Sequence, residues 1–211
     1  MKILRKLWLL VVLCMAAAAF NACDNEPELP VGHPTEEEGV EINGIVWATR
    51  NVNTPGTFAA RPESAGMFYQ WNRRTAWSSS GSISDWDTSP AEGTEWEEEN
   101  DPCPEGWRIP TQAELNNLRL QPNVWTTENG VEGRRFGNDS INIFLPAAGY
   151  RGNRYGMLLA QGRDRAGGYW SSTGSAGGIN AVELFFTSSR AVMFTNYHRA
   201  FAYPIRCVAI R

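Results

Sequence analysis

Residues 101–118 read Asp-Pro-Cys-Pro-Glu-Gly-Trp-Arg-Ile-Pro-Thr-Gln-Ala-Glu-Leu-Asn-Asn-Leu and contain the clearest helix start of the chain. Thr111 and Glu114 have the spacing of a capping box, in which each side chain accepts a hydrogen bond from a backbone amide that the helix leaves free. Leu115 and Leu118 follow on one helical face. The segment therefore predicts a short helix that packs on the core through its two leucines.

Short apolar segments on both sides of this helix predict strands. Val40–Trp47 holds Asn43-Gly44 between apolar alternations, and this dipeptide is the strongest short-range sign of a two-residue hairpin. No helical pattern separates the apolar segments late in the chain, so we expect their strands to pair antiparallel. These late strands are predicted at Ile141–Leu145, Tyr169–Thr173, Ala181–Thr187, Ala191–Thr195 and Ile205–Ile210. The fold class is α+β, with mainly antiparallel strands, one or two short helices and long loops.

Two segments between the hairpin and the helix are less regular. Pro62–Asn72 is predicted as a second short helix, because Pro62 suits a first turn and Phe68 shares a face with Ala65. Ser78–Asp101 carries eight acidic residues and no basic one, which predicts a long exposed loop. The alternative for this loop is a cation site built from Asp85, Asp87 and Glu92. Calcium needs six to eight oxygen ligands at tight spacing, and the loop does not show that spacing.

The first 23 residues have the order of an export signal. Three basic residues precede the apolar run Leu7–Ala19, and Ala22-Cys23 follows it. The run is 13 residues long, whereas a membrane-spanning helix needs about 20, so it suits the apolar region of a signal peptide. We therefore expect a lipoprotein signal peptide over residues 1–22, with Cys23 as the lipid acceptor. The alternative is an ordinary signal peptide with an incidental cysteine.

The segment behind Cys23 is short of residues that could be buried. It is rich in proline and acidic residues as far as Gly39, which predicts a solvated, disordered stalk over residues 23–39. Its acidic start resembles the surface-export signal of Bacteroidetes lipoproteins. This resemblance implies an outer-membrane protein that is held by acyl chains and faces the cell exterior. The remaining residues, 40–211, are expected to form one domain.

The charge balance of the chain excludes one class of partner. The whole sequence has a net charge of −4, and removal of the three basic residues in the signal makes it −7. Such an acidic surface repels nucleic acid, so no nucleic-acid partner is expected.

The cysteine count predicts one disulfide. Cys14 leaves with the signal peptide and Cys23 becomes the lipid anchor, so Cys103 and Cys207 can pair in only one way. In an oxidising compartment we expect them to be bonded. A metal-ligand or nucleophile pair is the competing interpretation. It is disfavoured because no histidines stand at ligand spacing near either cysteine.

Three sequence blocks, preceded by the Asn43-Gly44 hairpin, resemble the Fibrobacter succinogenes major paralogous domain. The blocks are Asp101–Thr111, Phe144-Leu-Pro-Ala-Ala-Gly-Tyr-Arg151, and Tyr169-Trp-Ser-Ser-Thr173 with the closing Pro204-Ile-Arg-Cys-Val208. The resemblance covers about residues 39–210 and implies a C-type-lectin-like fold related to formylglycine-generating-enzyme domains. It also implies that the first hairpin lies beside the last strand, with Cys103 tying the helical region to that strand. Family members are secreted proteins or lipoproteins without an established common activity.

The residues for catalysis are incomplete. Formylglycine-generating enzymes use a cysteine pair with copper near the end of the domain, and here Cys207 is the only cysteine in the last hundred residues. His33 lies in the stalk, so His198 is the single histidine of the domain and cannot build a metal triad. No catalytic residue, metal ligand or cofactor is predicted, and the chain is not expected to be an enzyme.

Binding is the remaining function, and the irregular loops offer the candidates. Arg151–Arg165 is rich in glycine and arginine on an otherwise acidic chain. Exposed aromatic side chains could stack on sugar rings or peptide side chains. Trp107 and Trp170 are better explained as core residues. The candidate ligand-binding residues are Trp125, Arg154, Tyr155, Arg163 and Arg165.

Two short motifs have competing interpretations. Gln121-Pro122-Asn123 resembles a signature of calcium-dependent sugar-binding lectins, but its place directly after the helix favours a simple helix stop. Asp139-Ser140-Ile141 matches the pattern of Bacteroidetes protein O-glycosylation, which makes Ser140 a possible attachment site. The leading expectation for function is a noncatalytic surface lipoprotein that binds a glycan, a peptide or an envelope protein. A structural subunit of a surface assembly is the alternative, followed by an enzyme of unknown type.

Overall fold

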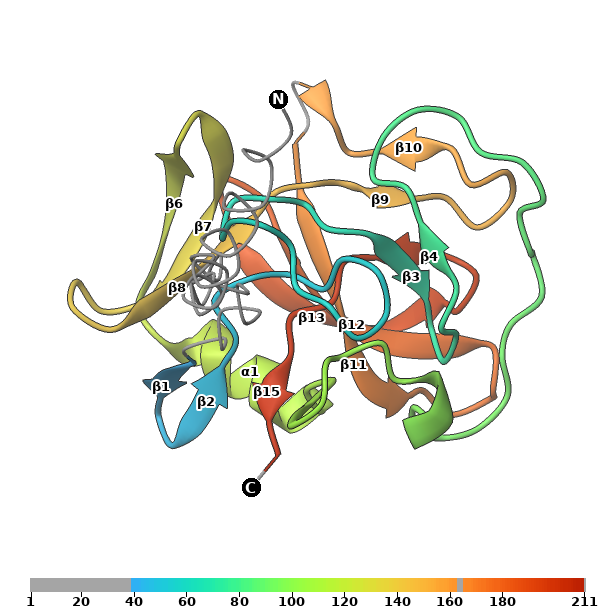
Figure 1. Ribbon diagram of the computed structural model, residues 1–211, viewed down its shortest axis with the longest axis horizontal. Helices are drawn as coiled ribbons and strands as arrows, with labels where there is room; N and C mark the ends of the chain where they lie inside the picture. The colour runs from blue at the N-terminus through green and yellow to red at the C-terminus, as the bar shows by residue number, and fades with distance from the viewer. Residues whose placement is uncertain (1–38, 163–164, 211) are drawn as a thin grey trace, which may run out of the picture. The chain divides into compact units, whose positions relative to one another are not determined.

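Antiparallel β-sheet makes up most of the regular structure in this computed structural model, which describes residues 39–162 and 165–210 (Figure 1). The described part contains one α-helix, α1 (Gln112–Leu120), and one short 3₁₀ helix, η1 (Glu98–Asn100). None of its helices is long and apolar enough to span a bilayer. The predicted signal peptide, the predicted lipid acceptor Cys23 and almost all of the predicted stalk lie outside the described residues.

The first sheet brings the two ends of the domain together. Its strand order is β1-β2-β15-β5, and Trp47 of β2 is paired with Val208 of β15. Asn43 and Gly44 join β1 to β2 with φ angles of 48° and 79°, so the predicted hairpin is confirmed. The strands are β1 (Val40–Ile42), β2 (Ile45–Trp47), β5 (Trp107–Arg108) and β15 (Val208–Ala209).

The predicted disulfide is confirmed and lies beside this sheet. Cys103 and Cys207 are joined by an S–S bond of 2.06 Å, with Cα atoms 6.1 Å apart. Cys207 directly precedes β15, and Cys103 lies shortly before β5 and α1. The bond therefore ties the start of the helical region to the last strand.

A three-stranded sheet carries the helix. Its order is β11-β12-β13, all antiparallel as predicted, and α1 packs on it. The capping box is present, since Thr111 Oγ1 accepts from the Glu114 amide and the Glu114 carboxylate accepts from the Thr111 amide. Leu115 and Leu118 are buried, as expected. The strands are β11 (Gly167–Gly174), β12 (Asn180–Phe186) and β13 (Ala191–His198).

The second three-stranded sheet contains a hairpin that the sequence analysis overlooked. β6 and β7 are joined by Asn129-Gly130, whose φ angles of 48° and 81° nearly repeat those of the first hairpin. Pro122 follows the end of α1, and Asn123 begins β6, which confirms the interpretation of Gln121-Pro122-Asn123 as a helix stop. The strands are β6 (Asn123–Glu128), β7 (Val131–Gly137) and β8 (Asn142–Pro146).

The five-stranded sheet replaces the helix that was predicted over Pro62–Asn72, and that prediction is wrong. Gly66 has a φ of +69°, and a Cβ there would lie 2.2 Å from the Val52 carbonyl oxygen. The chain therefore leaves helical geometry and forms β3. The order is β10-β9-β14-β3-β4. The strands are β3 (Phe68–Gln70), β4 (Ala76–Trp77), β9 (Tyr150–Arg151), β10 (Leu158–Leu159) and β14 (Ala202–Tyr203).

The predicted acidic loop runs along the edge of the domain between β4 and η1 (Figure 1). It has no regular secondary structure over residues 78–97 apart from an isolated bridge at Glu95, and most of its side chains are exposed. Trp86 and Trp96 depart from the predicted exposure. Trp86 is half-buried and donates to the Asn153 carbonyl, and Trp96 packs edge-on against Trp71 in the core. The loop is therefore held to the domain by its two tryptophans.

Candidate functional site

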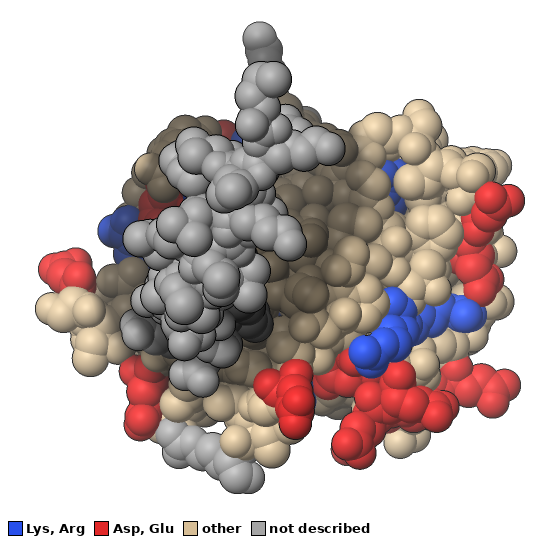
Figure 2. All heavy atoms as spheres, viewed as in Figure 1, with Lys and Arg blue, Asp and Glu red and all other residues tan. Residues whose placement is uncertain are grey.

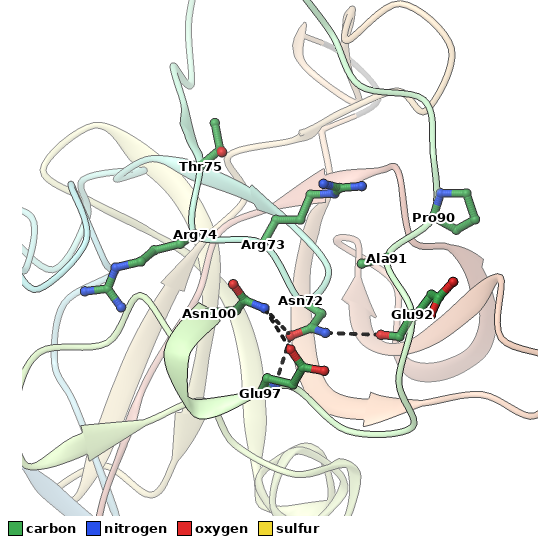
Figure 3. Close-up of a pocket in the computed structure, with 9 residues that line it drawn as sticks. All are labelled: Asn72, Arg73, Arg74, Thr75, Pro90, Ala91, Glu92, Glu97 and Asn100. Atoms are coloured by element: carbon green, nitrogen blue, oxygen red, sulfur yellow. Dashed lines mark hydrogen bonds between the residues drawn. The ribbon is translucent and has the colours of Figure 1, made fainter.

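Two adjoining hollows lie beside the acidic loop. The first, the Asn72 pocket, has a volume of about 500 Å³ and is lined by residues 72–75, residues 90–92, Glu97 and Asn100 (Figure 3). The second, the Trp107 groove, has a volume of about 650 Å³. It is lined by residues 103–109 together with Arg74, Glu95, Trp96, Glu98, Asp101, Thr111, Ser172 and Ile210. Arg74 lines both, so the hollows meet at this side chain. Figure 2 shows basic side chains in this region bordered by acidic ones.

Asn72 organises the first hollow. Its side chain is buried, its backbone has a φ of +55°, and it lies two residues after the end of β3. The amide oxygen accepts from the Glu97 backbone N–H at 2.9 Å and from Asn100 Nδ2 at 3.3 Å, while Nδ2 donates to the Glu92 carbonyl at 3.1 Å (Figure 3). The side-chain amide of Asn72 thus links the β3–β4 turn to the backbone of Glu92 and of Glu97, which both line the pocket.

We expect Asn72→Gly to lower the free energy of unfolding by about 2 kcal/mol, because it removes these hydrogen bonds but tolerates the positive φ. Asn72→Ala should cost about 1 kcal/mol more, because a Cβ-bearing residue without a local hydrogen bond is strained there. Urea unfolding measures both variants. Hydrogen exchange at the Glu97 amide should accelerate in each. Unchanged exchange at Glu97 would contradict the role of Asn72 as the organiser of this wall.

The two arginines of the β3–β4 turn point in opposite directions (Figure 3). Arg73 reaches toward the loop, where Nη2 lies 3.0 Å from Asp87 Oδ2 and donates to Ser89 Oγ at 2.8 Å. Hydrogen bonds from Ser89, assisted by the charge of Arg73, hold the pKa of Asp87 below its ordinary value. Arg74 Nη1 donates to the Asp101 carbonyl oxygen at 2.5 Å. Arg73 therefore fastens the loop, whereas Arg74 forms no ion pair with a described carboxylate.

Two buried arginine side chains hold the same loop through hydrogen bonds to its backbone carbonyls. Arg151 is 1% exposed and donates to the carbonyls of Ser78, Ser80 and Gly81 at the start of the loop. Arg199 donates to the Ala91 carbonyl at 2.7 Å. Its guanidinium also lies 4.0 Å from the ring centroid of Trp71, a cation–π contact. The loop beside the hollows is thus held by fixed donors rather than by regular secondary structure.

The Trp107 groove has an equally fixed wall. The Asp101 carboxylate accepts from the amides of Cys103 at 2.8 Å and Ile109 at 3.0 Å. Burial raises the pKa of Asp101, although these two hydrogen bonds oppose the shift. Arg108 forms a bidentate pair with Glu114, with oxygen contacts of 2.6 and 2.8 Å. Burial of Glu114 acts against ionisation, but the hydrogen bonds from Arg108 and Thr111 outweigh it and keep the pKa of Glu114 lowered.

Glu183 is the most unusual ionisable residue, and it lies outside both hollows. It sits in β12 opposite Trp170 and Phe194 and is fully buried. Glu183 Oε2 and the ring of Tyr203 lie against Gly168. Neither carboxylate oxygen of Glu183 nor the Tyr203 hydroxyl makes a hydrogen bond of normal geometry to a described residue. Burial raises the pKa of Glu183 well above its ordinary value. Burial also raises the pKa of the neighbouring Tyr150, Tyr197 and Tyr203, so these hydroxyls stay protonated at neutral pH.

Glu183→Gln should stabilise the protein increasingly as the pH rises. The folded state holds the Glu183 proton more tightly than the unfolded state, so its contribution is fully present in acid and is lost as pH rises toward the folded-state pKa. Between the unfolded-state and folded-state pKa values, the gap between variant and wild type should grow by about 1.4 kcal/mol per pH unit. Urea unfolding at several pH values measures it. The exposed Glu105→Gln is the control, and equal pH profiles for Glu183→Gln and wild type would refute the buried, protonated carboxyl.

The ligand-binding residues predicted from sequence are spread over different sheets. Trp125 lies in β6, half-buried, with its ring 6.4 Å from Phe186. Arg154 and Tyr155 are exposed between β9 and β10, with Tyr155 73% accessible. Arg165 Nε lies 3.4 Å from a carboxylate oxygen of Glu132 in β7, and Arg163 lies outside the described residues. These residues stay predictions of ligand contact.

Other predicted positions have clear places. Trp170 is fully buried, as expected, whereas Trp107 is only half-buried and lines the groove. Ser140 is exposed between β7 and β8, where Asn138 Oδ1 accepts from its amide, so an O-glycan could reach it. Within the described residues no group of three or more His, Cys, Asp or Glu side chains could hold a metal ion. The alternative cation site at Asp85, Asp87 and Glu92 is therefore not formed there.

The sequence analysis missed Asn72 and Arg74. The only local signal for Asn72 is its place directly after an apolar segment, where asparagine tolerates a left-handed turn. Its partners lie 20 to 28 residues away, in a loop without periodicity. No pattern in the sequence indicates which turn would face the acidic loop, so the meeting point at Arg74 becomes visible only in the folded chain.

Comparison with known protein families, with curated protein sequences and with solved structures found no match. The resemblance to the Fibrobacter succinogenes major paralogous domain therefore stays a prediction that rests on the quoted sequence blocks.

Proposed function

We propose that this chain is a noncatalytic binding module, displayed on the outer membrane as a lipoprotein, which takes a glycan, a peptide or an envelope protein in the two hollows. The observation that carries this proposal is the pair of adjoining hollows that meet at Arg74. Each has a volume in the range of ligand sites, about 300 to 1,000 Å³. The hydrogen bonds of Asn72 and Asp101 hold their walls, which reduces the ordering cost of binding.

The proposed fold agrees with this use of the loops. In a C-type-lectin-like domain, irregular loops on an antiparallel scaffold commonly form the recognition surface. Here one of the two longest irregular segments of the described residues, 78–97, supplies part of both walls. Conserved scaffolds with variable loops are the usual way in which binding function is placed on a fold.

A ligand screen tests the proposal. The purified chain is applied to arrays of glycans, peptides and envelope proteins, and binding is compared with that of Arg74→Ala. The exposed Arg190→Ala is a matched control that removes one arginine from a turn elsewhere. We expect a ligand whose binding falls at least tenfold with Arg74→Ala and stays unchanged with Arg190→Ala. Retention of every bound ligand by Arg74→Ala would show that the hollows are not the binding site.

The lipid anchor makes its own prediction. Labelled palmitate fed to the producing cells should enter the wild-type chain and be absent from Cys23→Ser, because only Cys23 has the position of a lipid acceptor. Cys14→Ser is the control and should keep full labelling. Labelling that persists in Cys23→Ser would refute anchoring at this residue.

A further inference from the structure

The rim of the Trp107 groove carries unbalanced negative charge. Glu95, Glu98 and Glu105 are exposed at its edge, and none of them forms an ion pair with a described residue. Glu92 and Glu97, at the edge of the Asn72 pocket, are also exposed and without an ionic partner among the described residues. Five carboxylates thus border the two hollows.

The positive charges of the site do not offset this excess. Arg108 is already paired with Glu114, and Arg73 with Asp87. Among the described residues that line the hollows, only Arg74 remains, and it donates to a backbone carbonyl. The field at the rim is therefore negative, which attracts cations and repels anionic ligands.

The floor between these carboxylates is apolar and aromatic. Trp107 is half-buried there, with its ring 5.6 Å from Phe58, and Pro104 and Ile109 lie beside it in the lining. Lysine and arginine side chains fit such a surface, because their methylene stems cover apolar atoms while their charged heads reach carboxylates. A cation over a tryptophan ring gains a further attraction.

Building on the proposed function, we infer that the ligand of this site is a basic peptide segment of a partner protein, with lysine or arginine side chains seated over the Trp107 groove and the Asn72 pocket. Two adjoining hollows suit a chain that presents successive side chains better than they suit one compact ion. The charge complementarity selects this occupant over an acidic peptide or an anionic glycan.

A crosslinking experiment locates the contact. The chain contains no lysine beyond residue 6, so its carboxylates have no lysine partner of their own in the domain. A carbodiimide should therefore join them to the amines of added octalysine, and mass spectrometry should find the new amide bonds at Glu95, Glu98 or Glu105. Crosslinks spread evenly over all exposed carboxylates would overturn the proposal.

Affinity measurements provide the matched test. Glu95→Gln/Glu98→Gln and Asp85→Asn/Asp139→Asn each remove two exposed carboxylates, the first pair at the groove and the second elsewhere. We expect octalysine affinity to fall at least tenfold for the first variant and less than twofold for the second. Equal losses of octalysine affinity in the two variants would indicate unspecific attraction to negative charge. Spermine that binds as tightly as octalysine would indicate a polyamine site. Either result overturns the peptide assignment. A neutral glycan that requires Arg74 while octalysine does not bind would sink this inference and leave the proposed function standing.

Discussion

Replacing Cys103 and Cys207 together by alanine should lower the free energy of unfolding by about 4 to 5 kcal/mol, because the disulfide closes a loop of 104 residues. The unfolded chain regains the freedom of that loop, and the last strand loses its covalent link to the segment before α1. For a chain of this size the melting temperature should drop by about 10 to 15 °C. Scanning calorimetry measures the drop directly.

Reduction of the wild-type protein is the matched control for this pair. It opens the same loop without changing any residue, so the reduced wild type and the double variant should melt within a few degrees of each other. Cys207 is fully buried, so the double variant also leaves a small void, and its melting temperature should be the lower of the two. A double variant that melts with the oxidised protein would show that the sheet alone holds the two ends of the domain.

The turns of this fold show how far a local signal reaches. Asn43-Gly44 and Asn129-Gly130 form hairpins with nearly equal φ angles, and both dipeptides are visible in the sequence. The second hairpin was overlooked because its strands, β6 and β7, carry polar and charged residues among few apolar ones. The dipeptide alone was the better guide, since its conformational demand does not depend on burial.

The periodicity of apolar residues gave wrong predictions of secondary structure and exposure where contacts with distant parts of the chain decided the conformation. The apolar spacing from Ala65 to Tyr69 suits a helix, but the backbone at Gly66 must pass close to Val52. Alternation along β12 puts Glu183 on the opposite face from Leu184 and Phe186, where a charged residue predicts exposure to solvent. Glu183 is nevertheless buried, because a second core covers that face of the sheet. Whether one or both faces of a strand are covered is a property of the whole fold, which alternation within the strand cannot reveal.

The cysteine pair and the candidate site mark the two extremes of predictability. Counting was enough to predict the bond between Cys103 and Cys207, because only these two cysteines remain after the predicted signal peptide and the predicted lipid acceptor are subtracted. The hollows depend on contacts between a turn, a loop and the end of the chain, none of which follows a repeating pattern. The burial of Arg151, Arg199 and Arg206 was equally unpredictable from the sequence, because a charged side chain ordinarily predicts exposure.

Arg206→Met should be the most damaging single substitution, with an expected loss of at least about 4 kcal/mol in the free energy of unfolding. Arg206 is 1% exposed, so its guanidinium lies wholly within the core. It donates to Asn51 Oδ1 at 2.9 Å and to the carbonyls of Ala48, Thr49 and Phe144 at 3.1, 2.6 and 3.1 Å. Methionine fills most of the volume but leaves four acceptors without these donors. Since domains are stable by only about 5 to 15 kcal/mol, much of the variant should be insoluble when expressed.

Two further variants separate the charge of Arg206 from the shape of its donor fork. Arg206→Lys keeps the charge but presents a compact ammonium that cannot reach acceptors on both the β2 side and β8, so an intermediate loss of about 2 kcal/mol is expected. The exposed Arg190→Met should stay within about 0.5 kcal/mol of wild type. Urea unfolding of the soluble variants gives the order of stability. If Arg206→Lys were as stable as wild type, the positive charge and not the planar donor fork would join these segments. If Arg206→Met were as stable as wild type, neither the charge nor the fork would be needed for stability.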